Sequence, residues 1–334
     1  MRKQKVVVLY GGKSAEREIS IRTGKQILAY LDRKKYQVIP LEIPQQGNGW
    51  VLRLLAAKPD VAFIALHDPF GEDGAIQGML EMLAIPYTFS GVLTSALAMD
   101  KFRLCEFVRG QGIKVPKGIL IRRTRSAAVY LPLSGGPNAP EQSSVRGRQA
   151  PALQSIKRYV GFPCVVKPNQ LGSSVGITVN VKNSRELYAA LKLALRYDGE
   201  VLVEEYIRGR EITAAILGNE NPRALPLIEI VAKIGSFYNY ESKYADGGSE
   251  HIIPAAIAKS LTKKIQALAI KAHALIGAKG VSRSDFILRD ATAYFLEINT
   301  IPGMTKTSLV PQAAQAAGIS FPKLLDQLII FALQ

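Results

Sequence analysis

Hydrophobic residues near the start of the chain come in short runs separated by helical patterns. Continuous apolar runs of strand length cover 5–10, 37–43 and 61–66. Amphipathic patterns that predict helices cover 15–31, 50–57 and 75–83. Ser14 is expected to cap the first helix, with Glu16 in its first turn. Strands that alternate with helices predict a parallel-sheet α/β domain over residues 1–90, with ligands beyond the carboxyl ends of its strands.

The rest of the chain repeats such patterns around one irregular segment. Helices are predicted over 95–109, 185–196 and 261–276. Strands are predicted over 162–168, 200–206, 212–217 and 225–231, and a further strand is predicted to begin at 177. The irregular segment, at about 122–158, carries seven Lys and Arg residues against one acid and is rich in Gly, Pro and Ser. With few aromatic residues interleaved, it favours a solvated surface loop over a nucleic-acid-binding segment. We therefore expect two further units, 91–207 with this basic insertion and 208–334.

A predicted β-hairpin near the end of the chain gathers oxygen ligands. Its strands cover 284–288 and 293–298, and two helices follow it. Because side chains alternate along a strand, Glu297 and Asn299 share a face, and pairing about Ala291 places Asp285 opposite Glu297. Two carboxylates and an amide oxygen suit Mg²⁺ bound with a polyphosphate, although Glu297 could equally be an ordinary solvated strand residue.

Other residues point to phosphate and anion binding. Lys167 ends a strand and a Gly- and Ser-rich turn, 169–176, follows it, which favours a phosphate cover over an ordinary hairpin. The turn after Pro302 leads into a helix near Ser308, and a helix N-terminus favours an anion. Glu16 and His67 both follow strand ends and so lie at one sheet edge, although a lone His is more often structural.

Composition narrows the class of protein. The chain has 334 residues, of which 48% are hydrophobic, and no apolar run reaches the length of a membrane span. Two cysteines predict neither a disulfide framework nor a Cys-based metal site, which suggests a cytoplasmic protein. The net charge of +16 allows nucleic acid or anionic metabolites as partners, but the basic residues are scattered and no nucleic-acid motif is present.

Several motifs occur in a specific order along nearly the whole chain. They are GGKSAEREIS, FGEDGAIQG, SALAMDK, VVKPNQLGSSVG, VEEYIRGREI, ESKY, RSDFIL and LEINTIPGMTKTSLVP. In this order they resemble the D-alanine–D-alanine ligases of the ATP-grasp superfamily. The resemblance implies an α/β fold in which a parallel-sheet domain precedes a two-part ATP-grasp fold. It also implies synthesis of D-alanyl-D-alanine for peptidoglycan, from two D-alanines and ATP, with two Mg²⁺ or Mn²⁺ ions, in a cytoplasmic homodimer without nucleic-acid or membrane partners.

The resemblance also implies residue roles. For ATP they are Lys101, Lys167, Glu204, Glu205, Tyr206, Ile207 and Glu211. For Mg²⁺ they are Asp285, Glu297 and Asn299. Glu16 and His67 correspond to residues around the first D-alanine, and Lys243, Ser308 and Leu309 to residues around the second. Arg283 and the Gly303 N–H correspond to the oxyanion donors, and Glu16, Ser173 and Tyr244 to residues that close loops over the site.

Two departures from the family pattern lie near the expected first-substrate site. Asp68 follows His67 where the family has glycine, and Phe89 replaces a small residue, so we expect either one to hinder the first substrate. Two alternative functions remain at this stage. One is a ligase that uses D-lactate as its second substrate. The Lys243–Tyr244 pair argues against it, because it resembles the pair found in ligases that make the dipeptide. The other is a basic nucleic-acid-binding protein on a degenerate ligase scaffold.

Overall fold

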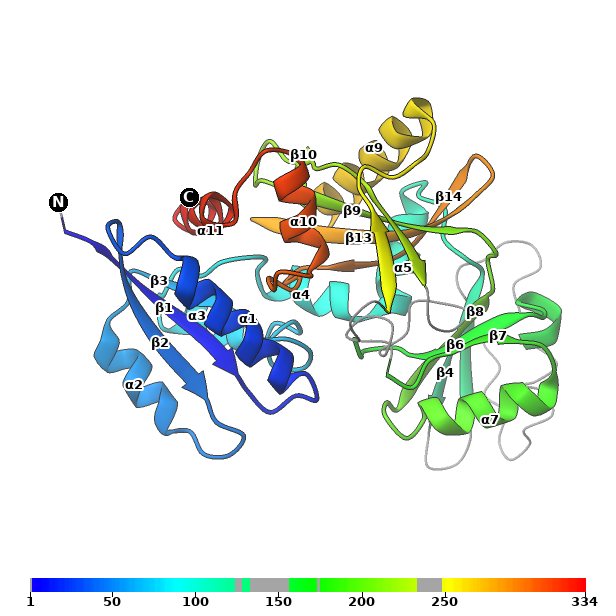
Figure 1. The fold of residues 1–334 in the computed structure, drawn as a ribbon. Helices are drawn as coiled ribbons and strands as arrows, with labels where there is room; N and C mark the ends of the chain where they lie inside the picture. The colour runs from blue at the N-terminus through cyan, green and yellow to red at the C-terminus, as the bar shows by residue number, and fades with distance from the viewer. Residues whose placement is uncertain (1, 124–127, 133–155, 173–174, 233–247) are drawn as a thin grey trace.

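Three β-sheets organise the protein (Figure 1). The computed structural model describes residues 2–123, 156–172, 175–232 and 248–334, together with the backbone of 128–132. The predicted order, a parallel sheet followed by two further sheets, is confirmed.

The N-terminal sheet has the order β2-β1-β3, with all strands parallel. Its strands are β1 (Gln4–Gly11), β2 (Tyr36–Ile43) and β3 (Val61–Ile64), and the helices α1 (Arg17–Tyr30), α2 (Gly49–Ala57) and α3 (Ala75–Met82) belong to the same region. The central strand β1 has a fully buried run, Val6–Leu9, as expected for a strand covered on both faces. The expected cap of α1 is wrong: Glu16 occupies the N-cap position, and the Ser14 hydroxyl accepts the Glu16 N–H at 3.2 Å.

The central sheet is antiparallel, with the order β5-β4-β8-β6-β7. Its strands are β4 (Gly118–Arg123), β5 (Ala128–Pro132), β6 (Cys164–Pro168), β7 (Thr178–Val181) and β8 (Glu200–Glu205), and α7 (Ser184–Ala194) packs on β6 and β7. β5 lies inside the segment predicted to be irregular, so that prediction is wrong for these five residues. Residues 124–127 and 133–155 of the segment lie outside the described residues.

The C-terminal sheet has the order β12-β11-β9-β13-β14, with β10 paired to β9. Its strands are β9 (Arg210–Leu217), β10 (Arg223–Ala224), β11 (Ile228–Ala232), β12 (Ser249–Ile252), β13 (Val281–Arg289) and β14 (Thr292–Asn299). Its helices are α9 (Lys259–Leu275), α10 (Leu309–Ala316) and α11 (Phe321–Ala332). The predicted strand over 225–231 begins three residues later than expected.

The helix predicted over 95–109 is two helices, α4 (Val92–Met99) and α5 (Lys101–Gly110). Asp100 separates them because its backbone is extended and its carboxylate accepts the Arg103 N–H at 2.9 Å. This aspartate is an N-cap, which starts a new helix rather than continuing the old one. The break places Lys101 at the first residue of α5.

Two hydrophobic cores join distant parts of the chain. One core combines the N-terminal sheet with α10, α11 and parts of β9 and β11. The other packs α4, α5 and α9 against β9, β13 and β14. The last helix lies close to the N-terminal sheet in Figure 1, and Asp326 in α11 accepts hydrogen bonds from Tyr36 and, at 2.7 Å, from Lys35. The N-terminal and C-terminal sheets are therefore fixed to each other.

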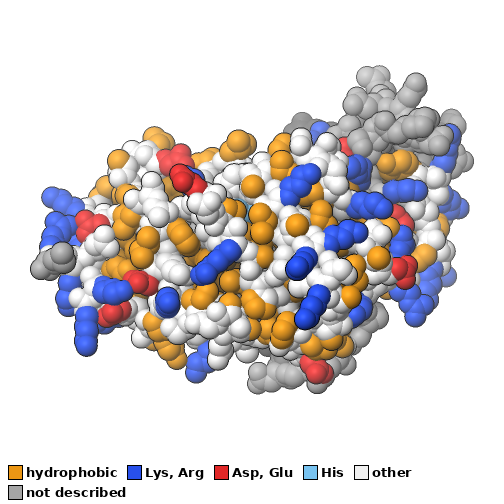
Figure 2. Space-filling view, turned by 90° about the horizontal axis from the view of Figure 1, so that it is seen from above, with side chains coloured by type: hydrophobic (Ala, Val, Ile, Leu, Met, Phe, Trp, Pro, Cys, Tyr) orange, Lys and Arg blue, Asp and Glu red, His pale blue; other side chains and the backbone are white. Residues whose placement is uncertain are grey.

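Positive charge is spread over the face of the molecule seen in Figure 2. Lys and Arg side chains occur along the whole face seen in Figure 2 and do not collect in one patch. Among the described residues, no helix combines the length and apolar character needed to cross a membrane.

Candidate active site

Two cavities meet at Glu297, which lines both. The first, here called the hinge cavity, has a volume of about 410 Å³ and lies between the central and C-terminal sheets. Besides Glu297, its lining includes seven predicted site residues: Lys167, Glu204, Glu205, Tyr206, Ile207, Glu211 and Asp285. The second, here called the helix cavity, has about 660 Å³ and lies between α1 and the start of α10. Its lining includes Glu16, His67, Arg283, Asn299, Gly303, Ser308 and Leu309.

The hairpin that carries Glu297 contains a β-bulge. Near the turn Leu288 pairs with Ala293 and Phe286 with Phe295, but Asp285 pairs with Glu297, so Leu296 is the extra residue. Asp290 forms the turn with a left-handed backbone, φ 56°. The predicted juxtaposition of Asp285 and Glu297 is confirmed, and the bulge produces it by shifting the register by one residue.

Asp285 is tied to its own strand and to β9. Its carboxylate accepts hydrogen bonds from Arg283 Nη2 at 2.8 Å and Nε at 3.1 Å, and from the Thr213 hydroxyl at 2.5 Å. Such a two-point arginine contact fixes the plane of the carboxylate. Arg283 pairs across the hairpin with Asn299, whose side-chain oxygen accepts the Ile301 N–H at 2.8 Å.

These residues fit magnesium. Mg²⁺ in nucleotide sites is held by one or two carboxylates together with phosphates and waters. Asp285, Glu297 and Asn299 offer two carboxylates and an amide oxygen from facing strands. Asp285 lines the hinge cavity, Asn299 lines the helix cavity, and Glu297 lines both. The Arg283 guanidinium forms an ion pair with Asp285 and so offsets part of the negative charge on this face.

Two buried lysines lie near this carboxylate pair. Lys167 Nζ is 2.6 Å from Glu204 Oε1, and both side chains are buried. Burial alone lowers the pKa of Lys167, but the carboxylates of Glu204 and Glu297 outweigh it and raise this pKa above its usual range. Lys101 Nζ donates to the Leu171 carbonyl at 2.6 Å and lies 3.8 Å from Glu297 Oε2. Lys167 therefore keeps its positive charge beside the acidic hairpin.

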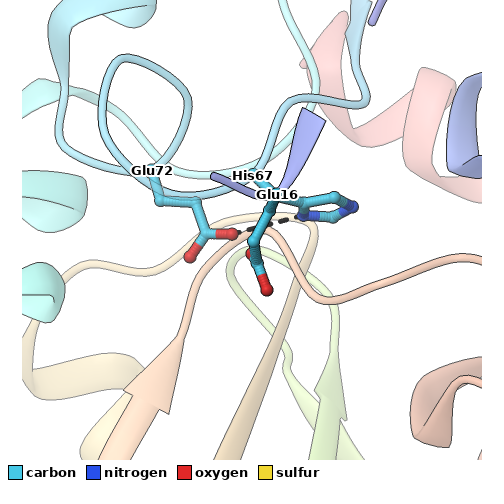
Figure 3. Close-up of side chains that lie close together, drawn as sticks. All are labelled: Glu16, His67 and Glu72. Carbon is cyan, nitrogen blue, oxygen red and sulfur yellow. Dashed lines mark hydrogen bonds and ion pairs between the residues drawn. The ribbon is translucent and has the colours of Figure 1, made fainter. Parts of the chain in front are cut away.

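A carboxylate–histidine group forms one end of the helix cavity (Figure 3). Glu16, His67 and Glu72 bring their ligand atoms within 4.8 Å of one another. His67 Nδ1 is 3.3 Å from Glu72 Oε1, and Nε2 is 3.0 Å from the Thr23 hydroxyl. Burial lowers the pKa of His67, but Glu72, Glu16 and Asp68 together raise it above its ordinary value. Because both ring nitrogens have protein partners, the group suits an ammonium ligand better than a metal ion.

Sequence reasoning missed Glu72. The motif FGEDG was used only to establish the family resemblance, yet its glutamate partners His67 and lines the helix cavity. The available signal was an acid five residues after a histidine within one loop at the carboxyl end of a strand.

The opposite end of the helix cavity is the start of α10. The helix predicted to begin near Ser308 is confirmed, with Ser308 at the N-cap position, and the Ser308 hydroxyl accepts the Thr305 N–H at 3.0 Å. Gly303 lies so close that a Cβ there would be 2.9 Å from the Ser308 hydroxyl oxygen. A side chain at this position would therefore displace the Ser308 hydroxyl from the turn, which directs backbone N–H groups and a helix dipole toward an anion.

Both departures from the family pattern lie outside the lining of the helix cavity. Phe89 does not crowd the helix cavity: it is buried in the core, with its ring edge-to-face against Phe63 at 5.7 Å. Asp68 is not in the lining of the helix cavity either, and its carboxylate accepts the Gly172 N–H at 3.0 Å. Three further predicted residues, Ser173, Lys243 and Tyr244, lie outside the described residues.

Comparisons with known proteins agree with this geometry. The profile of the D-ala D-ala ligase N-terminus matches residues 5–56 and 54–90, and that of the D-ala D-ala ligase C-terminus matches 140–330. The chain belongs to the D-alanine–D-alanine ligase family. It is 45% identical to the D-alanine–D-alanine ligase of Desulforamulus reducens, with 99% of each chain covered. It is 43% identical to that of Pelotomaculum thermopropionicum, over 99% of this chain and 97% of the relative.

Solved structures of ligases share the fold. The D-alanine–D-alanine ligase of Bacillus anthracis complexed with ATP superposes with a TM-score of 0.77 at 30% identity, covering 99% of this chain and 97% of that one. The VanG D-Ala:D-Ser ligase of Enterococcus faecalis superposes with a TM-score of 0.80 at 30% identity, covering 99% and 100%. The predicted fold, a parallel-sheet domain followed by a two-part ATP-grasp fold, is confirmed.

Proposed function

We propose that this member of the D-alanine–D-alanine ligase family joins two D-alanines, with conversion of ATP to ADP and phosphate. The single observation that supports this best is that the two cavities meet at Glu297. The hinge cavity has a buried lysine, Lys167, and carboxylates suited to a nucleoside triphosphate, and the helix cavity has an ammonium site at one end and an anion site at the other. A reaction between a phosphate and an amino acid carboxylate requires such a junction.

The first step transfers a phosphoryl group. A carboxylate oxygen of the first D-alanine attacks the γ-phosphorus of ATP, the bond to the β-phosphate oxygen breaks, and ADP and an acyl phosphate form. Lys101 and Lys167 hold the phosphates, and Glu204–Ile207 and Glu211 surround the adenosine. Asp285, Glu297 and Asn299 hold Mg²⁺, which when bound neutralises charge on the phosphates. Glu16, His67 and Glu72 orient the first D-alanine through its ammonium group.

The second step forms the amide bond. The amine of the second D-alanine attacks the acyl carbon and loses a proton, and the C–O bond to phosphate breaks to release inorganic phosphate. Arg283 and the Gly303 N–H donate to the oxyanion that forms on the acyl oxygen, which is the main electrostatic requirement of acyl transfer. Ser308, the Leu309 N–H and the helix dipole of α10 receive the carboxylate of the second D-alanine. Lys243 is proposed for the same carboxylate, and Ser173 and Tyr244 for loop closure with Glu16, on the family resemblance alone.

The proposed organisation has three units. Residues 1–90 bind the first substrate, residues 91–207 bind the nucleotide, and residues 208–334 bind the metal and the second substrate. We also propose a cytoplasmic homodimer that supplies peptidoglycan synthesis. Cys105 and Cys164 are buried free thiols, and burial raises the pKa of both to about 12, which agrees with a protein that does not use disulfides.

Measured ADP release tests this function. We expect release with D-alanine and ATP as the only substrates, and formation of D-alanyl-D-alanine. Parallel reactions with D-alanine plus D-lactate, and D-alanine plus D-serine, at several pH values, test the second substrate. A strong preference for D-lactate or D-serine at neutral pH would overturn the choice of D-alanine, and absence of ADP release with all three would overturn the ligase function.

A further inference from the structure

Asp68 is a buried carboxylate that bridges two parts of the protein. It follows His67 in the loop after β3 and has a left-handed backbone, φ 62°. Its side chain is buried, and Oδ1 accepts the Gly172 N–H from the loop that follows β6 at 3.0 Å. A buried charge is costly unless it is paired, so this contact compensates for desolvation that a glycine would never incur.

The loop that receives this contact, residues 169–172, is fixed on its other side to α5 and β8. The Lys101 N–H donates to the Asn169 carbonyl at 3.2 Å, and Lys101 Nζ donates to the Leu171 carbonyl at 2.6 Å. The Asn169 N–H donates to the Glu200 carbonyl at 3.0 Å. Lys101, a proposed phosphate-binding residue, thus contacts this loop at Leu171, and Asp68 contacts it at the next residue, Gly172.

The contact between Asp68 and Gly172 is close enough to exclude a side chain. A Cβ on Gly172 would lie 2.6 Å from Asp68 Oδ1. The charged groups that face Asp68 are Glu72, Lys101 and His67. Burial and Glu72 raise the pKa of Asp68 to about 6, while the Gly172 N–H, Lys101 and His67 act in the opposite direction. At neutral pH the contact is therefore a charge-assisted hydrogen bond.

We infer that Asp68 is a positioning residue that couples binding of the ATP phosphates to binding of the first D-alanine. The inference rests on the proposed function, since His67 and Glu72 flank the D-alanine end of the helix cavity and Lys101 holds the phosphates. A ligand that fixes the loop after β3 also stabilises the position of the 169–172 loop through the Asp68–Gly172 hydrogen bond, and the reverse also holds. Such coupling is reciprocal, so each ligand raises the affinity for the other by the same factor.

Equilibrium binding tests the coupling. The dissociation constant of D-alanine is measured calorimetrically with and without saturating adenylyl imidodiphosphate and Mg²⁺. For the unaltered protein we expect the analogue to tighten D-alanine binding at least about fivefold. Asp68→Gly removes the carboxylate and leaves an unstrained backbone, and Gly172→Ala blocks the same contact from the other side; in both we expect the factor to fall to about one. Asp68→Asn keeps an acceptor oxygen and should retain most of it.

Controls separate coupling from general damage. Asp290→Gly removes another aspartate with a left-handed backbone, at the exposed tip of the β13–β14 hairpin, and should keep the full factor. The double variant Asp68→Gly/Gly172→Ala should show the same coupling factor as either single variant, because both substitutions remove the same contact. A coupling factor near one in the unaltered protein, or a full factor in both Asp68→Gly and Gly172→Ala, overturns the inference. If the unaltered protein binds neither D-alanine nor the analogue, the proposed function itself fails.

Discussion

Lys167 and Glu204 form a buried ion pair with Nζ 2.6 Å from Oε1. They lie diagonally on neighbouring antiparallel strands, since Lys167 pairs with Leu202 and Glu204 with Val165. The sequence suggested separate roles for them, with the phosphates and with adenine. In the fold each is also the compensating charge of the other, so nucleotide binding and folding share these two side chains.

Removing one partner of this pair should destabilise the fold more than removing both. Glu204→Leu leaves the Lys167 ammonium buried without its nearest partner, and we expect a loss of about 3–5 kcal/mol in the free energy of unfolding. Lys167→Met/Glu204→Leu should recover a large part of that stability. Urea denaturation measures both. Binding of an ATP analogue should be lost in both variants, and equal stability of the single variant and the unaltered protein would contradict the account.

Glu297→Gln should nearly abolish ligation. The substitution removes one charge from the proposed metal site while keeping the shape of the side chain at the junction of the two cavities. We expect ADP release at saturating substrates to fall by more than about a hundredfold, beyond the effect of changing groups that only orient metal ligands. Asp290→Asn, at the tip of the same hairpin, serves as the control and should retain activity. Near-normal turnover in Glu297→Gln would exclude it as a metal ligand.

Asp68→Asn should stabilise the protein only where the pH is above about 4. The folded-state pKa of Asp68, about 6, exceeds its ordinary value of 3.8, so its ionisation disfavours the folded state. The gain from the amide should be absent below about pH 4, grow between about pH 4 and pH 6, and reach at most about 3 kcal/mol above that range. Unfolding midpoints across this range provide the measurement.

Asp60→Asn is the matched control with the opposite sign. The Lys5 N–H holds the pKa of Asp60 below its ordinary value, so its carboxylate stabilises the fold above that value. Its loss should therefore lower the unfolding midpoint at neutral pH. A gain for Asp68→Asn that did not change with pH would show that burial of the charge is not its cause.

Glu72→Gln should weaken binding of the first D-alanine. The neutral amide no longer favours the charged form of His67, so the pKa of His67 should fall and the ammonium site should lose negative charge. We expect KM for the first D-alanine to rise about tenfold, with a smaller change in kcat. Glu81→Gln, on α3 but outside the lining of the helix cavity, should leave KM unchanged. An unchanged KM in Glu72→Gln would remove this residue from the substrate site.

Local patterning was sufficient to predict most elements. The runs predicted at 5–10 and 61–66 contain the buried strands β1 and β3, although β3 ends at Ile64, because a sheet covered on both faces accommodates continuous apolar residues. One failure occurred where a polar side chain decides the local structure. The Asp100 carboxylate accepts the Arg103 N–H and divides a helix in two, a competition between side-chain and backbone hydrogen bonds that periodicity does not register. Others concern element bounds: Glu16 takes the N-cap position expected for Ser14, and β5 lies in a segment expected to be irregular.

The sequence by itself determined the family, the order of the sheets and the alternation that places Glu297 and Asn299 on one face of a strand. Only the tertiary structure decided that a bulge at Leu296 separates two registers of the hairpin, that Phe89 turns into the core and that Asp68 reaches Gly172. The physical reason is range: alternation and capping depend on neighbours along the chain. Register, burial and the pairing of charges depend on groups brought together from distant segments, here residues 68 and 172.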